Sequence, residues 1–417
     1  MAVREAIVSF GMQPPFGKNA EKGAGLAFPA LLYYNGENRG QEGMGNMQET
    51  QDWNVPKLGF GMMRLPKRDD GQIDMEQVEK MVDLFLARGF RYVDTAYGYM
   101  NSQSEACVGR ALTARHPRES FLLATKLPPW ALEKPEDMQR VFDTQLERTG
   151  AGYFDFYLLH SLGQSRLEAL DKLGAWDFLL EKQAQGLARH VGFSFHDTAD
   201  VLDKILTEHP QMEFVQLQLN YMDWEDEKVQ ARLCYETARR HGKRVVIMEP
   251  VRGGMLANLG GQARALMEAA QPGWSCASWA LRFAASLEGV VTVLSGMSTL
   301  AQMEENLDTM QSFVPLTRAE QETLRRVRET LRAIPTTPCT DCRYCTENCP
   351  RDIPIPGLIA LDNERTMYGV ANRGGYGMRT SGHGKASDCI ACGRCESRCP
   401  QKIGIISLLR QIASAFE

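Results

Sequence analysis

Residues 91–99 read RYVDTAYGY, and this stretch indicates both a fold and a functional site. It begins as a short strand pattern and ends in a loop that contains glycine. Asp94 stands at the predicted end of the strand, and Tyr99 follows five residues later in the loop. Because a buried carboxylate and a neighbouring phenol are suited to proton transfer, we expect chemistry at this strand end.

Strand and helix patterns alternate on both sides of this stretch. Eight strand patterns recur, roughly one every 33 residues, and a helical pattern follows each of them. The predicted strands are LGFGMMRL (58–65), RYVDTA (91–96), FLLATKL (121–127), FDFYLLH (154–160), RHVGFSF (189–195), FVQLQLN (214–220), RVVIMEP (244–250) and VVTVLSGM (290–297). The predicted helices run from a cap at Asp74 to a stop at Gly89 and then over 102–113, 135–149, 167–185, 197–208, 225–241, 272–285 and 299–310.

Strands that alternate with helices at this spacing predict parallel βα units. Eight such units across about 250 residues match the size of a (β/α)8 TIM barrel. A doubly wound open sheet is the alternative, and it is disfavoured because no G-x-G-x-x-G follows the first strand. The predicted class is therefore α/β, with the barrel over residues 51–315 and a small, mainly helical domain after it.

The two ends of the chain lie outside the barrel pattern. Residues 1–50 are rich in Gly, Asn and Gln, so we expect a disordered or loosely packed extension. Its apolar run LAFPALLYY is a candidate strand or packed arm, and we hypothesise that Met47 is the native start. At the other end, residues 316–417 begin with a charged amphipathic helix over 316–334, which leads into a cysteine-rich region.

Composition excludes several classes of protein. The 417 residues are 43% hydrophobic and 24% charged, as in globular proteins. A net charge of −5 argues against a nucleic-acid partner. The sequence contains neither the run of about 18 apolar residues that a membrane span needs nor a signal-peptide pattern. We therefore expect a cytoplasmic protein without a membrane span.

Polar side chains close several of the predicted strands. Lys126 ends FLLATK, His160 ends FDFYLLH and Ser194 ends RHVGFS. In a TIM barrel the site lies at the carboxyl ends of the strands, where Asp94 also stands. A lone Lys or His at a strand end is more often structural, but complementary groups on neighbouring strands favour a shared site.

The four groups Asp94, Tyr99, Lys126 and His160 suit carbonyl chemistry. A phenol with a pKa near 10 is a weak acid, and a nearby ammonium lowers that pKa by stabilising the phenolate. Lys126 is placed to do this, with Asp94 holding it charged. His160 is then expected to orient a carbonyl, at a site where negative charge develops on oxygen during hydride delivery.

Motifs across residues 55–310 resemble the aldo-keto reductase family. They are DTAYGY (94–99), SE (104–105), ATK (124–126) and LLH (158–160), in that order. The resemblance implies a (β/α)8 barrel, a bound nicotinamide cofactor (NADP or NAD) and a small carbonyl or alcohol substrate. It also implies that Tyr99 is the general acid, supported by Asp94, Lys126 and His160.

The same resemblance implies a set of cofactor contacts. Ser194 and Gln216 would meet the carboxamide. The loop Pro250, Val251, Arg252, Gly253 and Gly254 would meet the pyrophosphate, where glycine permits close backbone approach. Near the adenosine end the implied residues are Ser295, Gly296, Met297, Gln302, Glu305 and Asn306.

The chain departs from the family pattern at several of these positions. Phe195 stands where Asn often follows the Ser, and Met248 stands where an aromatic side chain usually stacks on the nicotinamide. Gly296, Met297 and Gln302 replace residues that often grip the 2′-phosphate of NADP. The choice between NADP and NAD therefore stays open, because cationic partners for that phosphate are missing from these positions.

Two cysteine runs near the carboxyl terminus have the same spacing, C-x2-C-x2-C-x3-C-P. This is the bacterial-ferredoxin pattern, in which three thiolates bind one iron–sulfur cluster and the fourth goes to the other cluster. It assigns Cys339, Cys342, Cys345 and Cys399 to one [4Fe-4S] cluster, and Cys389, Cys392, Cys395 and Cys349 to a second. Zinc is the alternative, and it is disfavoured because the four-cysteine run ending in Pro occurs twice. Disulfides are disfavoured further.

The segment between the runs has a helical pattern over 355–369 and a glycine-rich pattern over 372–385, which we interpret as a loop. This arrangement resembles the helical dicluster ferredoxins. The remaining cysteines, Cys107, Cys234 and Cys276, fall on predicted helices and are interpreted as core residues. His196, next to the predicted cofactor site, is interpreted as a loop or supporting residue.

Three functions are compatible with these patterns. The first is carbonyl reduction by NAD(P)H coupled to electron transfer through the clusters, with a flavin or a redox partner protein completing the path. The second is carbonyl reduction with structural or redox-sensing clusters. The third is an electron carrier or partner-binding module without catalysis, which the presence of Asp94, Tyr99, Lys126 and His160 disfavours.

Overall fold

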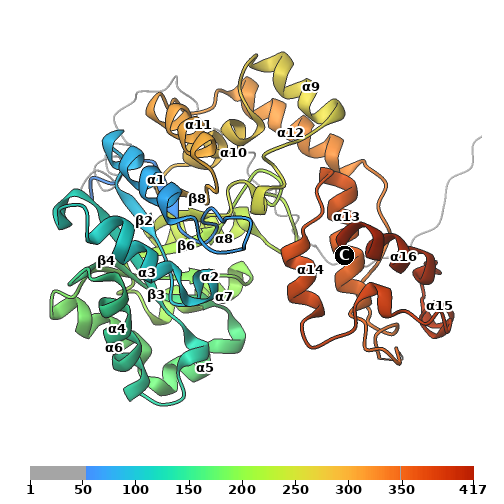
Figure 1. Ribbon diagram of the computed structural model, residues 1–417, viewed down its shortest axis with the longest axis horizontal. Coiled ribbons are helices and arrows are strands. Elements are labelled where there is room, and N and C mark those ends of the chain that lie inside the picture. Colours follow the sequence, from blue (N-terminus) through green and yellow to red (C-terminus); the bar gives the residue numbers. More distant parts are fainter. Residues whose placement is uncertain (1–52, 348) are drawn as a thin grey trace, which may run out of the picture. The chain divides into compact units, whose positions relative to one another are not determined.

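Eight parallel strands close into a barrel in the computed structural model, which describes residues 53–347 and 349–417 (Figure 1). Each strand pairs with the next in sequence, and β8 pairs with β1. The strands are β1 (Leu58–Gly61), β2 (Tyr92–Asp94), β3 (Leu122–Leu127), β4 (Phe154–Leu162), β5 (Ala188–Phe195), β6 (Phe214–Gln218), β7 (Arg244–Met248) and β8 (Val290–Ser295). The predicted (β/α)8 fold is therefore confirmed.

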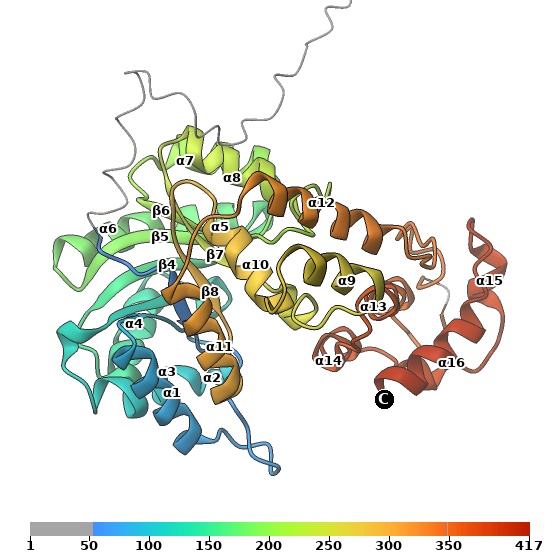
Figure 2. The same ribbon diagram turned by 90° about the horizontal axis from the view of Figure 1, so that it is seen from above.

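The helices before the cysteine runs mostly surround the strands (Figures 1 and 2). In chain order they are α1 (Met75–Ala87), α2 (Tyr99–Ser102), α3 (Ser104–Val108), α4 (Glu136–Thr149), α5 (Gln164–Leu173), α6 (Ala175–Ala184), α7 (Ala199–Glu208), α8 (Ala231–Arg240), α9 (Gly261–Ala270), α10 (Cys276–Ala285), α11 (Leu300–Gln311) and α12 (Arg318–Arg332).

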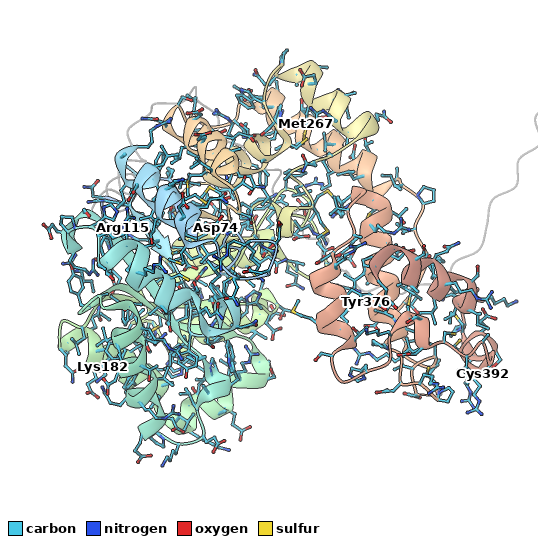
Figure 3. The ribbon with its side chains drawn as sticks, in the orientation of Figure 1. Asp74, Arg115, Lys182, Met267, Tyr376 and Cys392 are labelled. Carbon is cyan, nitrogen blue, oxygen red and sulfur yellow. The ribbon has the colours of Figure 1, made fainter. Side chains whose placement is uncertain are left out.

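Helix α1 begins and ends as its sequence predicts. The side chain of Asp74 accepts a hydrogen bond from the backbone N–H of Gln77, which caps the first turn (Figure 3). An apolar stripe that includes Val78, Met81 and Phe85 is buried against the barrel. The Gln77 side chain accepts from the backbone N–H of Leu300, so the start of α1 is tied to α11.

The helix predicted over 102–113 is present from Ser104 to Thr113, and the residues just before it are not α-helical. Met100, Asn101 and Ser102 have φ angles of 53°, 55° and 64°, so the chain leaves the α-helical region directly after Tyr99. Helix α3 then passes into a π-helical turn at Gly109–Thr113. Helix α4 approaches so closely here that a Cβ on Gly109 would lie 2.4 Å from the carbonyl oxygen of Arg148.

Three other predicted helices differ from the structure. The helix over 167–185 is two helices, α5 and α6, because Gly174 between them has a φ of 71°. The helix over 225–241 begins at Ala231, and that over 272–285 begins at Cys276, where Ser275 caps it. Helix α9 was not predicted.

Helix α12 packs along α9 (Figure 2). It begins with a capping box in which Thr317 and Glu320 bond to each other's backbone N–H groups. Leu324, Val327 and Leu331 are buried in a core shared with α9 and α10. Helix α12 therefore packs its apolar face on α9 and α10, which belong to the barrel part of the chain.

The residues after α12 form a small helical domain. Its helices are α13 (Ile355–Tyr368), α14 (Arg373–Thr380), α15 (Arg394–Arg398) and α16 (Ile405–Phe416). Helix α14 corrects the prediction of a loop over 372–385. Its glycines lower helix propensity, but Asn372 caps it through the N–H of Gly375 and Tyr376 stacks on Phe416 (Figure 3).

The predictions for residues 1–50, including the apolar arm and a start at Met47, lie outside the described residues. Within residues 53–347 and 349–417, no helix has the length and apolar character needed to cross a bilayer.

Candidate active site and cluster cysteines

The carboxyl ends of β2 and β3 bring Asp94 and Lys126 together. The ammonium of Lys126 donates to both carboxylate oxygens of Asp94, at 2.7 and 2.8 Å, and to the carbonyl oxygen of Thr95 at 2.8 Å. Both side chains are buried. Burial by itself lowers the pKa of Lys126, but Asp94 and Tyr99 raise it above its usual value, so the ammonium stays charged at neutral pH.

A buried polar network supports the backbone at Lys126. Gln145 on α4 donates to the carbonyl oxygen of Lys126 at 3.0 Å and to the carboxylate of Glu105 at 2.7 Å. Glu105 also accepts from the hydroxyl of Thr125 at 2.8 Å and pairs with Arg148 at 3.2 Å. Sequence reasoning missed this network, because its members lie on three different elements and share no spacing.

Tyr99 lies beside this ion pair. The Lys126 nitrogen is 4.9 Å from the centre of its ring, and the ring meets that of His160 edge to face at 5.7 Å. We expected Lys126 to lower the pKa of the phenol. Lys126 does lower it, but burial of the hydroxyl raises the pKa of Tyr99 by more, so that its net pKa lies above the usual value. Tyr99 is therefore protonated at neutral pH, which is the state that a general acid requires.

His160 near the end of β4 is a neutral imidazole. Burial lowers its pKa to about 2, and Lys126, His196 and Arg166 act in the same direction. Its Nδ1 atom is buried and has no hydrogen-bond partner among the described residues. The indole of Trp130 lies 4.9 Å from the imidazole, centre to centre. A neutral ring with an unsatisfied nitrogen is suited to binding a ligand atom.

A cavity of about 300 Å³ opens beside Asp94 and Tyr99, and its size is typical of small-molecule sites. It is lined by Gly61, Met63, Arg64, Asp94, Tyr99, Gln216, Met248, Glu249, Pro250, Val251, Gly253, Gly254, Leu294, Gly296, Ser298 and Gln302. The cavity therefore runs from the Asp94–Tyr99 site along the ends of β6, β7, β8 and β1.

Seven of the predicted cofactor contacts line this cavity, and they are Gln216, Pro250, Val251, Gly253, Gly254, Gly296 and Gln302. The Oε1 atom of Gln216 is buried and lacks a hydrogen-bond partner in the described part of the chain, so it is suited to accepting from a carboxamide. Gly253 and Gly254 have φ angles of 66° and 98°, a backbone form in which their N–H groups stay accessible to a phosphate. These residues fit a nicotinamide dinucleotide.

The other predicted cofactor contacts are not on the cavity lining. The hydroxyl of Ser194 accepts from the N–H of Ser161 at 2.7 Å, and that of Ser295 accepts from Asn306 at 3.0 Å. Glu305 is exposed on α11. The two serines and Asn306 therefore brace the strand ends behind the cavity.

Arg252 is also absent from the lining, although it belongs to the predicted pyrophosphate loop. Its guanidinium donates to buried Asp223 at 2.9 Å and pairs with Glu364 on α13 at 3.6 Å. It also lies 5.3 Å from the ring centre of Tyr368. One residue of this loop is thus bonded to the helix that follows the first cysteine run.

Arg64 and Glu249 are cavity residues that sequence reasoning missed. They form an ion pair at 3.5 Å, and the Arg64 guanidinium lies 3.4 Å from the position of a Cβ on Gly253. Arg64 was assigned to the first strand, but that strand ends at Gly61 and leaves Arg64 in the loop at the carboxyl end of the barrel. A prediction that ended the first strand at Gly61 would have placed Arg64 in that loop.

The two cysteine runs fold alike. Asp341 and Ala391, at matching positions, have φ angles of 53° and 52°, and Asp352 and Lys402 have 49° and 52°. Helices α13 and α16 start at matching positions after the runs, and each opens with a buried Ile. The domain therefore contains an internal repeat, which is visible in its backbone conformation as well as in its cysteine spacing.

One of the two predicted cysteine sets lies around a shared cavity. Cys349, Cys389, Cys392 and Cys395 line one small cavity, together with apolar side chains that include Ile353 and Leu409. This is the set predicted to share a cluster, with Cys349 contributed by the other run. Cys392 is exposed at the edge of its domain (Figure 3). No three metal-ligating side chains among the described residues surround a single-ion position.

The fold and site define a (β/α)8 barrel with a polar strand-end site, joined to a helical domain that carries two cysteine runs. Residues 57–329 match the model of the Aldo/keto reductase family, and residues 338–404 match that of the 4Fe-4S dicluster domain. The chain belongs to the aldo/keto reductase family.

Its similarity to individual relatives covers part of each protein. An aldo-keto reductase of Mycolicibacterium smegmatis is 32% identical over 146 residues, which are 34% of this chain and 46% of the relative. The methylglyoxal reductase DkgA of Escherichia coli is 30% identical over 162 residues, 37% of this chain and 52% of the relative. The chain thus spans about half the length of these curated relatives.

Solved structures share the barrel. A holo-form aldo-keto reductase from Bacillus halodurans aligns with a TM-score of 0.54 at 23% identity, over 66% of this chain and 92% of that chain. An aldo-keto reductase from Klebsiella pneumoniae in complex with NADPH aligns with a TM-score of 0.54 at 19% identity, over 66% and 91%. At these identities the likeness concerns the fold.

Proposed function

We propose that this protein is an NAD(P)H-dependent oxidoreductase that reduces a carbonyl compound, or oxidises the corresponding alcohol, with Tyr99 as general acid. The observation that carries the proposal is the buried Lys126–Asp94 pair beside Tyr99, at the mouth of a cavity of ligand size. The clusters in the carboxyl-terminal domain add electron transfer to this reaction. A cytoplasmic location is part of the proposal, since a reducing compartment keeps the cysteines as thiols.

Each residue has a defined task in carbonyl reduction. A bound nicotinamide supplies the hydride. Tyr99 donates its proton to the oxygen that becomes the hydroxyl, and the Lys126 ammonium stabilises the phenolate that remains. Asp94 keeps Lys126 charged and fixed in position. Because His160 is neutral, it donates a hydrogen bond to the carbonyl oxygen without competing as an acid.

Arg64 supplies the cation that the expected adenosine-end positions lack. It lines the cavity together with Gly253, Gly296 and Gln302, and its only ion pair within the described chain is with Glu249. A guanidinium is well shaped to bind phosphate oxygens in pairs. We assign Arg64 to the nucleotide phosphates and expect a preference for NADP over NAD.

The cysteine runs hold two [4Fe-4S] clusters in this proposal, with the ligand sets crossed between the runs. Each cluster moves one electron, whereas a nicotinamide moves two as hydride. The path between them therefore includes a flavin or a redox partner protein. Clusters with a structural or redox-sensing role are the alternative, and the contact of Arg252 with α13 is compatible with either.

The direct test is anaerobic turnover. The protein is purified without oxygen, its iron and sulfide are measured, and NADPH oxidation is followed with a panel of aldehydes and ketones. Tyr99→Phe is expected to abolish NADPH oxidation while leaving the Kd for NADPH within about twofold, because the proton and not the binding contact is removed. Near wild-type turnover in Tyr99→Phe would defeat the mechanism.

A further inference from the structure

We infer that the substrate is a carbonyl compound bearing a carboxylate a few bonds from the carbonyl, and that Arg166 binds that carboxylate. The inference rests on the proposed carbonyl reduction and names the class of substrate for the same site. Reduction then converts an oxo acid into a hydroxy acid. The nicotinamide is oxidised as it gives up hydride, Tyr99 supplies the proton, and the carboxylate is unchanged.

Arg166 lies close to the proposed reaction centre. It belongs to the first turn of α5, which follows β4 and His160. Its guanidinium carbon is 5.5 Å from the centre of the Trp130 ring, and that ring is 4.9 Å from the centre of His160. The guanidinium and the imidazole are therefore separated by at most the sum of these two distances, which a small oxo acid can span.

Trp130 connects these groups into one wall. Its ring lies 3.6 Å from the position of a Cβ on Gly98, the residue before Tyr99, and 55% of the residue is exposed. An exposed indole with both a guanidinium and an imidazole near its ring gives a substrate an apolar surface beside these polar groups. Arg166 and His160 both lie close to that indole ring, at 5.5 and 4.9 Å from its centre.

The charge of Arg166 is not balanced by a neighbouring carboxylate. No ion pair joins it to an acidic side chain in the described residues, and one of its N–H groups donates to the carbonyl oxygen of Ser161. Asp197 reaches the start of α5, but its carboxylate accepts from the backbone N–H groups of Gln164 and Thr198. The remaining donors of Arg166 are available to a ligand.

The two imidazoles near Arg166 are neutral. The pKa values of His160 and His196 are both lowered, by burial first and by Arg166 among the further causes. The imidazoles therefore add no positive charge of their own, and the other cation that acts on His160, Lys126, is paired with Asp94. A fixed guanidinium with open donors favours a carboxylate, because the fork of N–H groups matches the two oxygens.

The competing explanation is that Arg166 only anchors the loop, by its contact with Trp130 and its hydrogen bond to Ser161. The two explanations differ in what they predict for charged and uncharged substrates. An anchoring role affects all carbonyl substrates alike. A carboxylate-binding role affects only the acid.

The test compares 4-oxobutanoate with butanal, using NADPH and the anaerobic full-length protein. We expect wild type to have a kcat/KM at least about tenfold higher for the acid, and Arg166→Gln to lower that value by about 10- to 100-fold, as for loss of a charged hydrogen bond. The value for butanal should stay within about twofold of wild type. Equal loss for both substrates, or no loss for either, would overturn the inference.

Two further variants control this comparison. Arg166→Lys keeps the charge but loses the fork, so it should recover part of the preference for the acid. Arg140→Gln removes an exposed arginine of α4 that pairs with Asp137, and it should leave the ratio of the two kcat/KM values unchanged.

A binding measurement separates this inference from the proposed function. Calorimetry of NADP-loaded protein with butanoate and with butanamide needs no turnover. We expect butanoate to bind more tightly and Arg166→Gln to remove the difference. Equal affinities in wild type would overturn the role of Arg166. If instead no aldehyde is reduced while butanoate is still preferred, the proposed reaction fails and the anion site stands.

Discussion

The ammonium of Lys126 lies 2.7 and 2.8 Å from the two carboxylate oxygens of Asp94, and both side chains are buried. Removing one partner leaves an uncompensated buried charge, which costs roughly 3 kcal/mol or more. Replacing both partners with apolar residues removes that penalty. Stability and catalysis therefore depend on this pair in different ways.

The first prediction follows from that difference. Lys126→Met should lower the free energy of unfolding by ~3 kcal/mol and abolish turnover, whereas Lys126→Met with Asp94→Leu should recover most of the stability and no activity. Urea denaturation and NADPH oxidation measure the two effects. Lys80→Met, which breaks an exposed pair with Glu76, serves as control and should change stability by less than about 0.5 kcal/mol. Activity in the double variant would contradict the role of Lys126.

The second prediction concerns pH. In the unfolded chain His160 takes up a proton below its ordinary pKa near 6.5, but the folded protein holds it neutral down to about 2. Because the unfolded state then binds more protons, stability falls as the pH drops below 6.5, by at most about 1.4 kcal/mol per pH unit and less where solvent reaches the ring. His160→Gln should flatten this fall between pH 6.5 and 4.5 in urea titrations. An equally steep fall in the variant would show that other groups cause it.

The third prediction concerns cofactor choice. Arg64→Gln should raise the Kd for NADPH by about 10-fold and the Kd for NADH by less, since a charged hydrogen bond to the extra phosphate is lost. Fluorescence titration of both nucleotides gives the ratio. Arg68→Gln, in the same loop but paired with Asp70 and outside the cavity, is the matched control. Equal shifts for NADPH and NADH would assign Arg64 to the pyrophosphate and not to the 2′-phosphate.

The fourth prediction concerns the clusters. Cys392→Ser should lower bound iron by about half, because one of two [4Fe-4S] clusters loses a ligand. If the clusters take part in the reaction, carbonyl turnover with NADPH should fall as well. Cys107→Ser changes a buried cysteine outside both runs and should keep full iron content. Unchanged turnover in folded Cys392→Ser would exclude electron transfer from that reaction and favour structural clusters.

The sequence predicted the strand-end groups well because barrel geometry fixes their place. Asp94, Lys126 and His160 each stand at or near the end of a strand pattern, and parallel strands bring such ends to one rim. The family resemblance, and not barrel geometry, pointed to Gly253 and Gly254 in the loop after β7, and both line the cavity with positive φ angles. The cysteine spacing repeats in the sequence and in the backbone alike.

Loop residues were harder to predict. Trp130 and Arg166 lie in or beside connections without periodicity, so nothing in the sequence joins them to His160. The place of Arg64 in the cavity was not predicted, because its apolar neighbours extended the predicted strand past Gly61. Helix α14 was predicted as a loop because its glycines have low helix propensity. The cap at Asn372 and the packing of Tyr376 on Phe416 overcome that low propensity.

The last prediction concerns the bond between the cofactor loop and α13. Arg252 belongs to the loop that lines the cavity, and its guanidinium pairs with Glu364 at 3.6 Å and with buried Asp223 at 2.9 Å. Glu364→Gln should let the loop move, and should raise the Kd for NADPH a fewfold without changing iron content. Glu329→Gln, which changes an exposed side chain of α12, is the control.

Iron removal gives a second test of the same connection. Chelating the iron should loosen the cysteine runs on either side of α13, and it should weaken NADPH binding in wild type more than in Glu364→Gln, where the connection is already lost. Fluorescence titration before and after chelation measures both effects. If chelation changes the Kd equally in the two proteins, the pair of Arg252 and Glu364 does not couple the cluster domain to the cofactor site.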